Sequence, residues 1–429
     1  MKNHFYSPFD FQRKEDLKKN EEEVRSPFQI DRDRIIFSYA FRRLQSKTQV
    51  FQSGEYDFYR NRLTHSIEVA KIGRSIAEFH NEVSDYLSPE FSISTDLVEA
   101  IGLSHDLGHP PFGHIGERKL NKIMAEFGGF EGNAQTLRIV TQLFYNRPEG
   151  SQGMNPTRAL VDGVMKYKSL QCDLVETNSQ SETSYPKNHF LYDEDRCWLE
   201  FVEDVASGSQ RAQFGLKSLE CQIMDWADDT AYSINDIIDS IQAGYLTPEK
   251  IESWAENANL DKEDSESVHE LIQTILGARH ESFLNRQIGQ FIRATHIAKA
   301  KENSFSNISN RYGFVLEIDP LIQQKAELYK KLAVDLIFRS TQIQRIEYKG
   351  GLILEKLYEA LQKNYLESPK KSQLSLIPKR FQVELANKES EREKMRILCD
   401  CVAEMTDALA VKTYKQLFDP DFGSILDII

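Results

Sequence analysis

Residues 101–114 read Ile-Gly-Leu-Ser-His-Asp-Leu-Gly-His-Pro-Pro-Phe-Gly-His, and this stretch decides how the neighbouring chain folds. Leu97, Ile101 and His105 follow one another at steps of four, the spacing of residues on one face of a helix. The prolines at 110–111 should end this helix, because the residue before a proline is pushed out of helical geometry. The pattern predicts a helix that carries His105 into the core.

An earlier segment predicts a second inward histidine. Within residues 60–79, Val69, Ile72 and Ile76 form one apolar helical stripe, and His65 lies on the same stripe four residues before Val69. We therefore expect His65 to point towards the core from a separate helix.

A third helix is expected at about residues 218–242. Its apolar face is formed by Ala227, Ala231, Ile234, Ile238 and Ile241. Asp228, Tyr232 and Asp236 line up beside that face at steps of four. This helix predicts a carboxylate that can approach the two histidines.

Helical patterns continue towards the end of the chain. Further helices are expected at residues 321–347, 351–364 and about 390–418. Gly350 and Gly351 should separate the first two of these helices, and Ser390 with Glu393 has capping-box spacing. Thr95 is a suitable N-cap for the helix that leads to His105.

Strand patterns are sparse, so the sequence predicts an all-α fold. The best strand candidate is residues 311–316, where one short β-hairpin is expected. Two polar stretches, residues 171–195 and 256–267, predict an insertion or loops rather than separate domains.

Composition excludes several classes of protein. With 40% hydrophobic and 28% charged residues over 429 positions, the chain is too apolar to be disordered. The formal net charge of −13 disfavours an extended nucleic-acid or membrane surface, which needs a basic face. The 5 cysteines are an odd number without a CxxC pair, which indicates a reducing compartment. No signal peptide or membrane-length apolar run is found, so we expect a cytoplasmic protein.

Two imidazoles and two carboxylates are expected to converge from the three helices. His65, His105, Asp106 and Asp228 would form a mixed nitrogen and oxygen site that suits Mn²⁺, Fe²⁺ or Mg²⁺ with open positions. The alternative is a buried polar network whose members satisfy one another. Burying these groups without an ion would cost free energy, which favours the metal.

The motifs around these residues resemble those of a known superfamily. Three segments resemble the H…HD…D motif of HD-domain proteins. They are RLTHS at residues 62–66, HDLGHPPFGH at residues 105–114 and ADDTAYS at residues 227–233. A closer resemblance, to the bacterial deoxyguanosinetriphosphate triphosphohydrolases, rests on four further segments. They are SPFQIDRDRI, AFRRLQ, KTQVF and FEGNAQ at residues 26–35, 40–45, 47–51 and 130–135.

The resemblance covers roughly residues 25–240 and implies how the chain is organised. An N-terminal segment at 1–27 would precede an HD-domain catalytic core at 28–245. Residues 246–429 would form a helical C-terminal part that contributes to the core and to an oligomer interface.

The resemblance implies the metal ligands His65, His105, Asp106 and Asp228. Asp225 and Asp229 compete with Asp228, but the motif favours Asp228, as does the helix face that it shares with Tyr232 and Asp236. The cofactor expected at this site is Mn²⁺ or Mg²⁺, with Fe²⁺ or another transition metal as an alternative.

The family reaction cleaves a deoxynucleoside triphosphate, dGTP foremost, into deoxynucleoside and intact triphosphate, and so controls dNTP pools. An acid is needed to protonate the leaving 5′-oxygen. His114 suits this task because histidine titrates near neutral pH, and Glu117 lies three residues on, in reach if the segment is helical. The family likewise has a catalytic histidine and acid at these positions.

Eight further residues are expected to bind substrate. The residues that resemble the family's triphosphate ligands are Arg62, His109, Lys166 and Tyr167. Those that resemble its contacts with the sugar or base are Gln49, Tyr232 and Asp236. One more, Asn133, resembles a residue near the family's catalytic histidine. For the deoxy sugar, the aspartate would bind the 3′-hydroxyl and the tyrosine would crowd out a 2′-hydroxyl.

Two other readings compete with this one. The same metal residues serve HD-type phosphodiesterases and nucleotidases, and a non-catalytic nucleotide- or nucleic-acid-binding regulator is a rival of another class. Relatives are oligomers, hexamers or tetramers, and some respond to a second dNTP as effector. We therefore expect a homo-oligomer, a dNTP substrate, a dNTP effector site and no membrane partner.

Overall fold

The computed structural model describes residues 3–15, 22–49, 60–144, 153–177, 183–203, 216–301 and 308–422. In these ranges the fold is helical, with two short two-stranded sheets. The all-α prediction is confirmed. The first half of the chain contributes α1 (Pro27–Ile36), α2 (Tyr39–Arg43), α3 (Arg62–Val83), α4 (Thr95–Ser104), α5 (Gly113–Met124), α6 (Gly132–Arg138), α7 (Arg158–Val164), α8 (Arg196–Glu203) and α9 (Leu219–Gln242).

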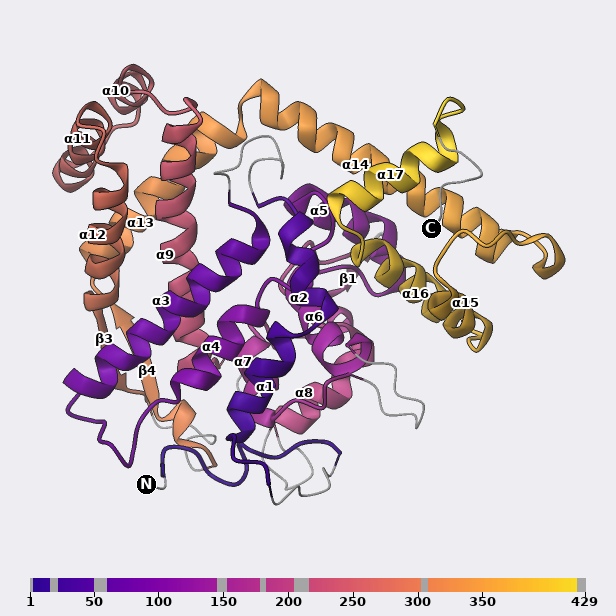
Figure 1. Ribbon diagram of the computed structural model, residues 1–429, viewed down its shortest axis with the longest axis horizontal. Helices are drawn as coiled ribbons and strands as arrows, with labels where there is room; N and C mark the ends of the chain where they lie inside the picture. Colours follow the sequence, from indigo (N-terminus) through magenta and orange to yellow (C-terminus); the bar gives the residue numbers. More distant parts are fainter. Residues whose placement is uncertain are drawn as a thin grey trace.

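The second half is also mainly helical. It contains α10 (Pro248–Asn257), α11 (Lys262–Leu276), α12 (His280–Arg293), α13 (Pro320–Ala333), α14 (Thr341–Gln362), α15 (Lys379–Ala386), α16 (Glu391–Ala403) and α17 (Asp407–Phe418). In Figure 1, α14 crosses the top of the molecule and joins α13 to the C-terminal helices α15–α17.

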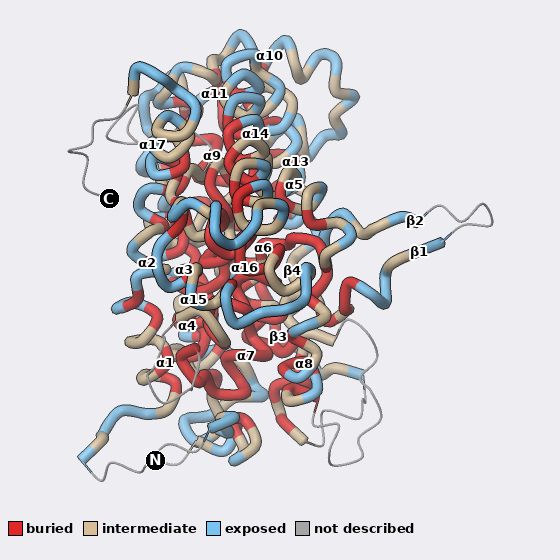
Figure 2. Tube along the Cα trace, turned by 90° about the vertical axis from the view of Figure 1, so that its right-hand side faces the viewer, coloured by how far each residue is buried: buried red, intermediate tan, exposed pale blue. Residues whose placement is uncertain are grey.

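The two small sheets are both antiparallel. Strand β3 (Thr295–Lys299) pairs with β4 (Phe314–Ile318), so the expected hairpin is present, with its second strand shifted towards the C-terminus. Strands β1 (Glu176–Thr177) and β2 (Thr183–Ser184) form a pair that the sequence did not predict. Figure 2 shows β1 and β2 projecting, exposed, from a centre in which buried segments are concentrated.

The core divides into three main apolar clusters. The largest joins α1, α3, α4, α7 and α9 with Phe5 and Tyr6 of the N-terminal segment. A second lies between α5 and helices α14–α17, and a third joins the end of α9 to α11 and α13. Because α3 packs on both α4 and α9, the three helices expected to carry the site form one bundle.

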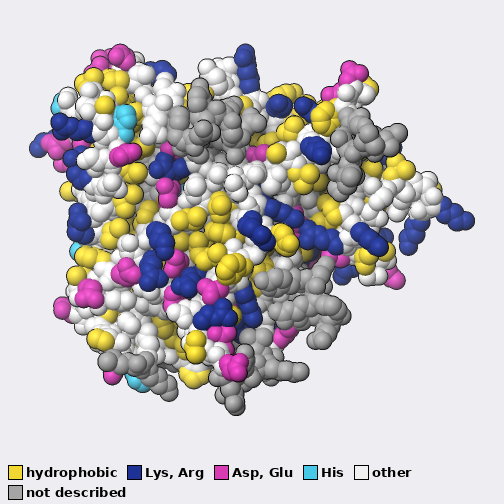
Figure 3. Space-filling model, viewed as in Figure 1, with side chains coloured by type: hydrophobic (Ala, Val, Ile, Leu, Met, Phe, Trp, Pro, Cys, Tyr) yellow, Lys and Arg dark blue, Asp and Glu magenta, His cyan; other side chains and the backbone are white. Residues whose placement is uncertain are grey.

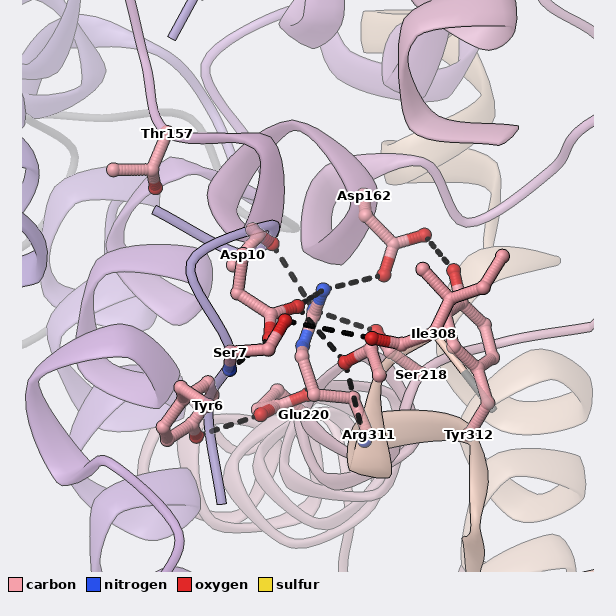
Figure 4. A network of polar contacts seen from close by, with 12 residues as sticks. Tyr6, Ser7, Asp10, Thr157, Asp162, Ser218, Glu220, Ile308, Arg311 and Tyr312 are labelled. Atoms are coloured by element: carbon pink, nitrogen blue, oxygen red, sulfur yellow. Dashed lines mark hydrogen bonds and ion pairs between the residues drawn. The ribbon is translucent and has the colours of Figure 1, made fainter. Parts of the chain in front are cut away.

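A buried ion-pair network fixes the N-terminal segment to this bundle (Figure 4). The Arg311 side chain is 2% exposed and contacts Asp162 at 3.0 Å and Glu220 at 2.9 Å. The hydroxyl of Tyr6 donates to the other oxygen of Glu220 at 2.7 Å. Removing one partner of such a buried pair typically costs about 3–5 kcal/mol, so the network holds the start of α9 firmly.

Several predicted helix boundaries were wrong. The helix that leads to His105 begins after Ser94, not Thr95, because the Ser94 hydroxyl accepts from Leu97 N at 3.3 Å. It ends at Ser104 with His105 as C-cap, well before the prolines at 110–111. The polar stretch at 256–267 is largely helical, divided between α10 and α11.

The glycine pair and the last helix also differ from the prediction. Gly350 and Gly351 lie inside α14, which runs unbroken from residue 341 to 362. A Cβ atom on Gly350 would lie 2.6 Å from the Phe112 ring, so this glycine permits close packing rather than ending a helix. The expected helix at 390–418 is two helices, because Thr406 starts α17 with its own side-chain cap.

No helix in the described ranges is both long and apolar enough to cross a bilayer. On the face seen in Figure 3, basic side chains are most frequent over the part that holds α15 and α16, so charge is unevenly distributed.

Candidate active site

Three helices bring a histidine and carboxylate cluster together. His65 lies in the first turn and a half of α3, His105 follows the last residue of α4, and Asp228 lies in α9. One ligand atom of each lies within 4.8 Å of the others. His65 and His105 are buried, as the apolar periodicity predicted.

The distances in this cluster are those of groups facing one centre. His65 Nε2 lies 3.2 Å from Asp228 Oδ1, and His105 Nε2 lies 3.7 Å from the same oxygen. Asp106 is the neighbour of this trio, with Oδ1 at 3.6 Å from His105 Nε2. All four residues expected to bind a metal are therefore adjacent.

His105 shows that the cluster fits a cation. Its Nδ1 donates to the carbonyl of Gly102 at 2.6 Å, which leaves the lone pair of Nε2 directed at the cluster. That Nε2 atom is buried and has no hydrogen-bond partner among the described residues. Two imidazole nitrogens with two carboxylates form a donor set that suits a divalent first-row metal or Mg²⁺.

Asp106 is held ionised by its neighbours. Burial alone would raise the pKa of this carboxyl, but His109 and Arg62 outweigh it and hold the pKa well below its usual range. Arg62 Nη1 lies 2.7 Å from Asp106 Oδ2, and His109 Nδ1 lies 2.9 Å from Oδ1. Arg62 thus lies beside the cluster, and one nitrogen of its guanidinium group is paired with Asp106.

A second group of side chains borders the cluster. His109, His114 and Glu117 offer ligand atoms within 4.8 Å of one another. His114 Nδ1 lies 3.4 Å from Glu117 Oε2, and the His109 and His114 rings are 5.7 Å apart. The expected histidine and acid pair is therefore in contact, and it lies in the first turns of α5, as its spacing required.

Glu117 is itself fixed by the backbone. Its Oε1 accepts from Gly132 N at 2.7 Å, while His114 faces the other oxygen. Although burial opposes ionisation, His114 and His109 lower the pKa of Glu117 to about 2. An ionised Glu117 can therefore orient the His114 ring through the contact at 3.4 Å.

Glu131 is a residue that sequence reasoning missed. It is buried, accepts from Ala134 N at 2.8 Å, and receives the Asn133 amide at 2.8 Å. Burial first, then the nearby Glu117, raises the pKa of Glu131 to about 7. Asn133 is thus turned towards Glu131. The sequence signal that could have found Glu131 was its position directly before α6, where it is the N-cap.

Lys166 and Tyr167 lie on another side of the cluster. Lys166 Nζ is 3.0 Å from Asp225 and 3.9 Å from Asp228 Oδ2. The Tyr167 ring stacks on His189 with centroids 4.1 Å apart. A positive group therefore reaches the edge of the cluster, as expected of Lys166.

Lys217 joins this group although the sequence did not indicate it. Its Nζ contacts Asp225 and lies 5.8 Å from the centre of the Tyr167 ring. No motif surrounds this lysine, so only the fold could reveal it. Asp225 thus pairs with two lysines, Lys166 and Lys217. Asp229 pairs with Lys330 at 2.6 Å. Asp228 is therefore the aspartate that lies beside the histidines.

Tyr232 and Asp236 extend the site along α9. Asp236 is buried, and its Oδ2 has no hydrogen-bond partner among the described residues. Burial is the main cause that raises the pKa of Asp236 to about 8. Gln49 likewise has a buried Oε1 without a partner within the described part of the chain.

A cavity adjoins these groups. It has a volume of about 280 Å³ and is lined by Gln49, Phe112, His114, Tyr232, Gly350 and Val411, among others. The cavity lies between the HD-motif residues and helices α14 and α17, so the C-terminal part of the chain forms one wall.

Comparison with known proteins agrees with this geometry. Residues 62–233 match the HD domain family, and residues 316–416 match the phosphohydrolase-associated domain. HD domains typically depend on divalent metal ions. The match to the HD domain therefore includes all four residues of the proposed metal cluster, as well as His114 and Glu117.

Several curated proteins are similar over most of their length. The chain is 33% identical over 430 residues to deoxyguanosinetriphosphate triphosphohydrolase-like protein 2 of Deinococcus radiodurans, covering 95% of this chain and 96% of the relative. It is 34% identical over 454 residues to a deoxyguanosinetriphosphate triphosphohydrolase-like protein of Shewanella woodyi, covering 98% of both. A similarly named protein of Haemophilus influenzae is 35% identical over 454 residues, covering 92% of this chain and 94% of the relative.

Proposed function

Because this chain belongs to the HD-domain family of deoxyguanosinetriphosphate triphosphohydrolase-like proteins, we propose that it hydrolyses dGTP to deoxyguanosine and triphosphate. The observation that supports this most is the contact between two groups. His109 joins the His65, His105, Asp106 and Asp228 cluster to the His114 and Glu117 pair: its Nδ1 lies 2.9 Å from Asp106 Oδ1, and its ring centre lies 5.7 Å from that of His114.

The four cluster residues would hold a divalent cation, Mn²⁺ or Mg²⁺ first, with Fe²⁺ as an alternative. A bound divalent cation supplies Lewis-acid polarisation of a phosphate oxygen and favours hydroxide over water. His105 is prepared for this role by the Gly102 carbonyl, which fixes its Nδ1 proton.

His114 would protonate the leaving 5′-oxygen. Its Nδ1 faces Glu117, so its other ring nitrogen is the one that can donate to substrate. Glu117 keeps its negative charge because His114, His109 and the Gly132 N–H stabilise it. This charge orients the His114 ring, whose other nitrogen would donate to the 5′-oxygen.

The triphosphate would lie between two groups of side chains that can donate to phosphate oxygens, of which Arg62 and the two lysines carry the positive charge. Arg62 and His109 flank one side of the cluster, and Lys166 with Lys217 flanks the other. A substrate carrying about four negative charges needs this concentration of positive charge, because charge spreads over the phosphoryl oxygens during cleavage.

The sugar and base would occupy the cavity beside α9. Asp236 Oδ2 is a buried oxygen that can accept the 3′-hydroxyl, and Tyr232 restricts the space available for a 2′-hydroxyl. Gln49 and the apolar wall formed with α14 would contact the base. This arrangement favours deoxynucleotides over ribonucleotides.

The experiment that tests this function is product analysis. The protein is incubated with dGTP, GTP or the other dNTPs and with Mn²⁺ or Mg²⁺, and the products are separated by ion exchange. We expect equal amounts of deoxyguanosine and triphosphate, and little cleavage of GTP. Release of dGMP or of orthophosphate would instead identify an HD-type phosphodiesterase or nucleotidase, and no turnover would favour a regulator.

Two variants sharpen this test. His114→Ala should lower kcat by about 10²–10⁴-fold, the usual loss for a general acid, while Mn²⁺ binding is retained. His296→Ala is the matched control, because His296 is an exposed histidine in β3, far along the chain from the cluster. Equal activities of the two variants would contradict the role of His114.

An oligomer and a dNTP effector site complete the proposal. Light scattering should give a mass that is a multiple of 49.6 kDa, consistent with a tetramer or hexamer. Rates measured with dNTPs in pairs should exceed the sum of the single rates if a second nucleotide activates the enzyme.

A further inference from the structure

The first residue of α17 contacts two segments that are far away in the sequence. The Asp407 side chain is buried, and its Oδ1 accepts from Phe112 N at 2.9 Å. Its Oδ2 accepts from Thr48 N at 2.9 Å and also from the Thr48 hydroxyl. One carboxylate from the C-terminal part thus binds two backbone amides beside the candidate active site.

Both bound segments lead directly into site residues. Thr48 precedes Gln49, whose side chain lines the cavity, and Phe112 lies two residues before His114. Phe112 is the residue before α5 and makes no side-chain cap, so its backbone fixes where the helix that carries His114 begins.

Phe112 has a backbone conformation that needs external support. Its φ of 63° lies in the left-handed region, which is rare for a bulky residue and typically costs about 1–3 kcal/mol. Two contacts oppose that cost. Asp407 holds the Phe112 amide, and the ring packs over Gly350 of α14.

The Lys47 side chain also connects these segments by hydrogen bonds. Lys47, next to Thr48, donates from Nζ to the carbonyl of His109 and, at 3.0 Å, to that of Ala403 at the end of α16. The backbone around 47–48, 109–112 and 403–407 is therefore held together by the buried side chains of Lys47 and Asp407.

The helix α17 does not itself need the Asp407 carboxylate. The Thr406 side chain already caps α17 by accepting from Leu409 N at 3.2 Å. The carboxylate instead accepts hydrogen bonds from two other segments. This distinguishes Asp407 from an ordinary acidic residue in the first turn of a helix, whose effect is on the helix dipole.

We propose that Asp407 is a positioning residue for the reaction: it fixes the backbone of Thr48 and Phe112 and thereby places Gln49 and His114 around the cavity. This inference rests on the proposed function. It assigns to the phosphohydrolase-associated region a direct part in arranging the active site, beyond forming a wall of the cavity.

The test compares three variants of the full chain. Asp407→Ala removes all three hydrogen bonds, and Asp407→Asn keeps one acceptor oxygen. Thr406→Ala is the matched control, because it removes the cap of the same helix and leaves the Asp407 carboxylate in place. Loss of such a cap costs about 1 kcal/mol, so the control reports destabilisation of α17 alone.

Amide hydrogen exchange gives a readout that does not depend on turnover. In Asp407→Ala, peptides that cover residues 47–49 and 110–114 should exchange faster, whereas in Thr406→Ala only the peptide that covers 407–418 should do so. Unchanged exchange at 47–49 and 110–114 in Asp407→Ala would overturn the positioning role.

Kinetics with dGTP provide the second readout. We expect Asp407→Ala to lower kcat at least tenfold with a smaller change in KM, Asp407→Asn to recover part of kcat, and Thr406→Ala to retain it. Equal loss of kcat in Asp407→Ala and Thr406→Ala would overturn the proposal. If the parent protein does not cleave dGTP, the proposed function fails, and the exchange data still decide the role of Asp407.

Discussion

Asp195 is a fully buried carboxyl whose surroundings favour its protonated form. Its Oδ1 accepts from the Gln142 amide at 2.7 Å, while its Oδ2 has no hydrogen-bond partner among the described residues. Burial raises the pKa of Asp195 from an ordinary 3.8 to about 7, and the nearby Arg138 opposes this only in part.

The shifted pKa makes stability depend on pH. Between pH 4 and pH 7 the folded protein holds the Asp195 proton more tightly than the unfolded chain, so this group's contribution to the free energy of unfolding falls as pH rises. Asp195→Asn should remove that fall. We expect the variant to be more stable than the parent by about 4 kcal/mol at pH 8 and nearly equal at pH 4, because a pKa shift of about three units corresponds to about 1.4 kcal/mol per unit.

Urea unfolding at pH 4, 6 and 8 measures this difference. The control is Asp173→Asn, a change at an exposed aspartate in the same region, which should leave the pH profile of the parent unchanged. A constant difference between Asp195→Asn and the parent at all three pH values would contradict the raised pKa.

Single residues differ in how far the sequence could reveal them. His65 and His105 could be placed in the core because helical periodicity fixes which side chains share a face. Asp407 could not, since its partners are backbone amides in distant segments. No local pattern encodes such contacts, which exist only after α16 and α17 have packed against the bundle.

The contact between α3 and α4 sets the distance between His65 and His105. Gly102 of α4 lies so close to Ala70 of α3 that a Cβ atom would come within 2.7 Å of the Ala70 Cα. The same glycine supplies the carbonyl that receives the His105 Nδ1 proton. Backbone atoms cannot move aside easily, so any larger residue must push the helices apart.

Gly102→Ala should therefore weaken metal binding as well as stability. We expect a loss of about 1–3 kcal/mol from overpacking and a Mn²⁺ affinity lower by about tenfold, because the two histidines separate. Thermal unfolding and calorimetric titration with Mn²⁺ measure the two effects.

Gly289→Ala in α12 is the matched control. Its new Cβ would meet only the flexible end of Arg293, so stability should stay the same or rise slightly. If Gly102→Ala bound Mn²⁺ as tightly as Gly289→Ala, the close contact of α3 and α4 would not govern the cluster.

Helices were predicted well where one apolar stripe faces one core. Helix α9 matches the predicted 218–242 within one residue at its start. The glycine pair of α14 misled the prediction, because glycine ends helices and also permits close helix packing. Only the position of the Phe112 ring distinguishes the two uses here.

The C-terminal part of the molecule both encloses and supports the site. Helices α14–α17 share an apolar cluster with α5, so the wall of the cavity and the helix that carries His114 are one packed unit. The sequence predicted an HD core at 28–245 with a helical extension at 246–429, and that division stays a prediction. It could not show that the extension reaches His114, because the contacts join residues about 295 positions apart.

The position of a labelled oxygen tests the central claim most directly. Hydrolysis of dGTP with Mn²⁺ in ¹⁸O-labelled water, followed by mass spectrometry of both products, identifies the bond that breaks. Attack at the α-phosphorus, with His114 protonating the 5′-oxygen, predicts one ¹⁸O in triphosphate and none in deoxyguanosine. Label in deoxyguanosine, or label in orthophosphate released stepwise, would contradict this account.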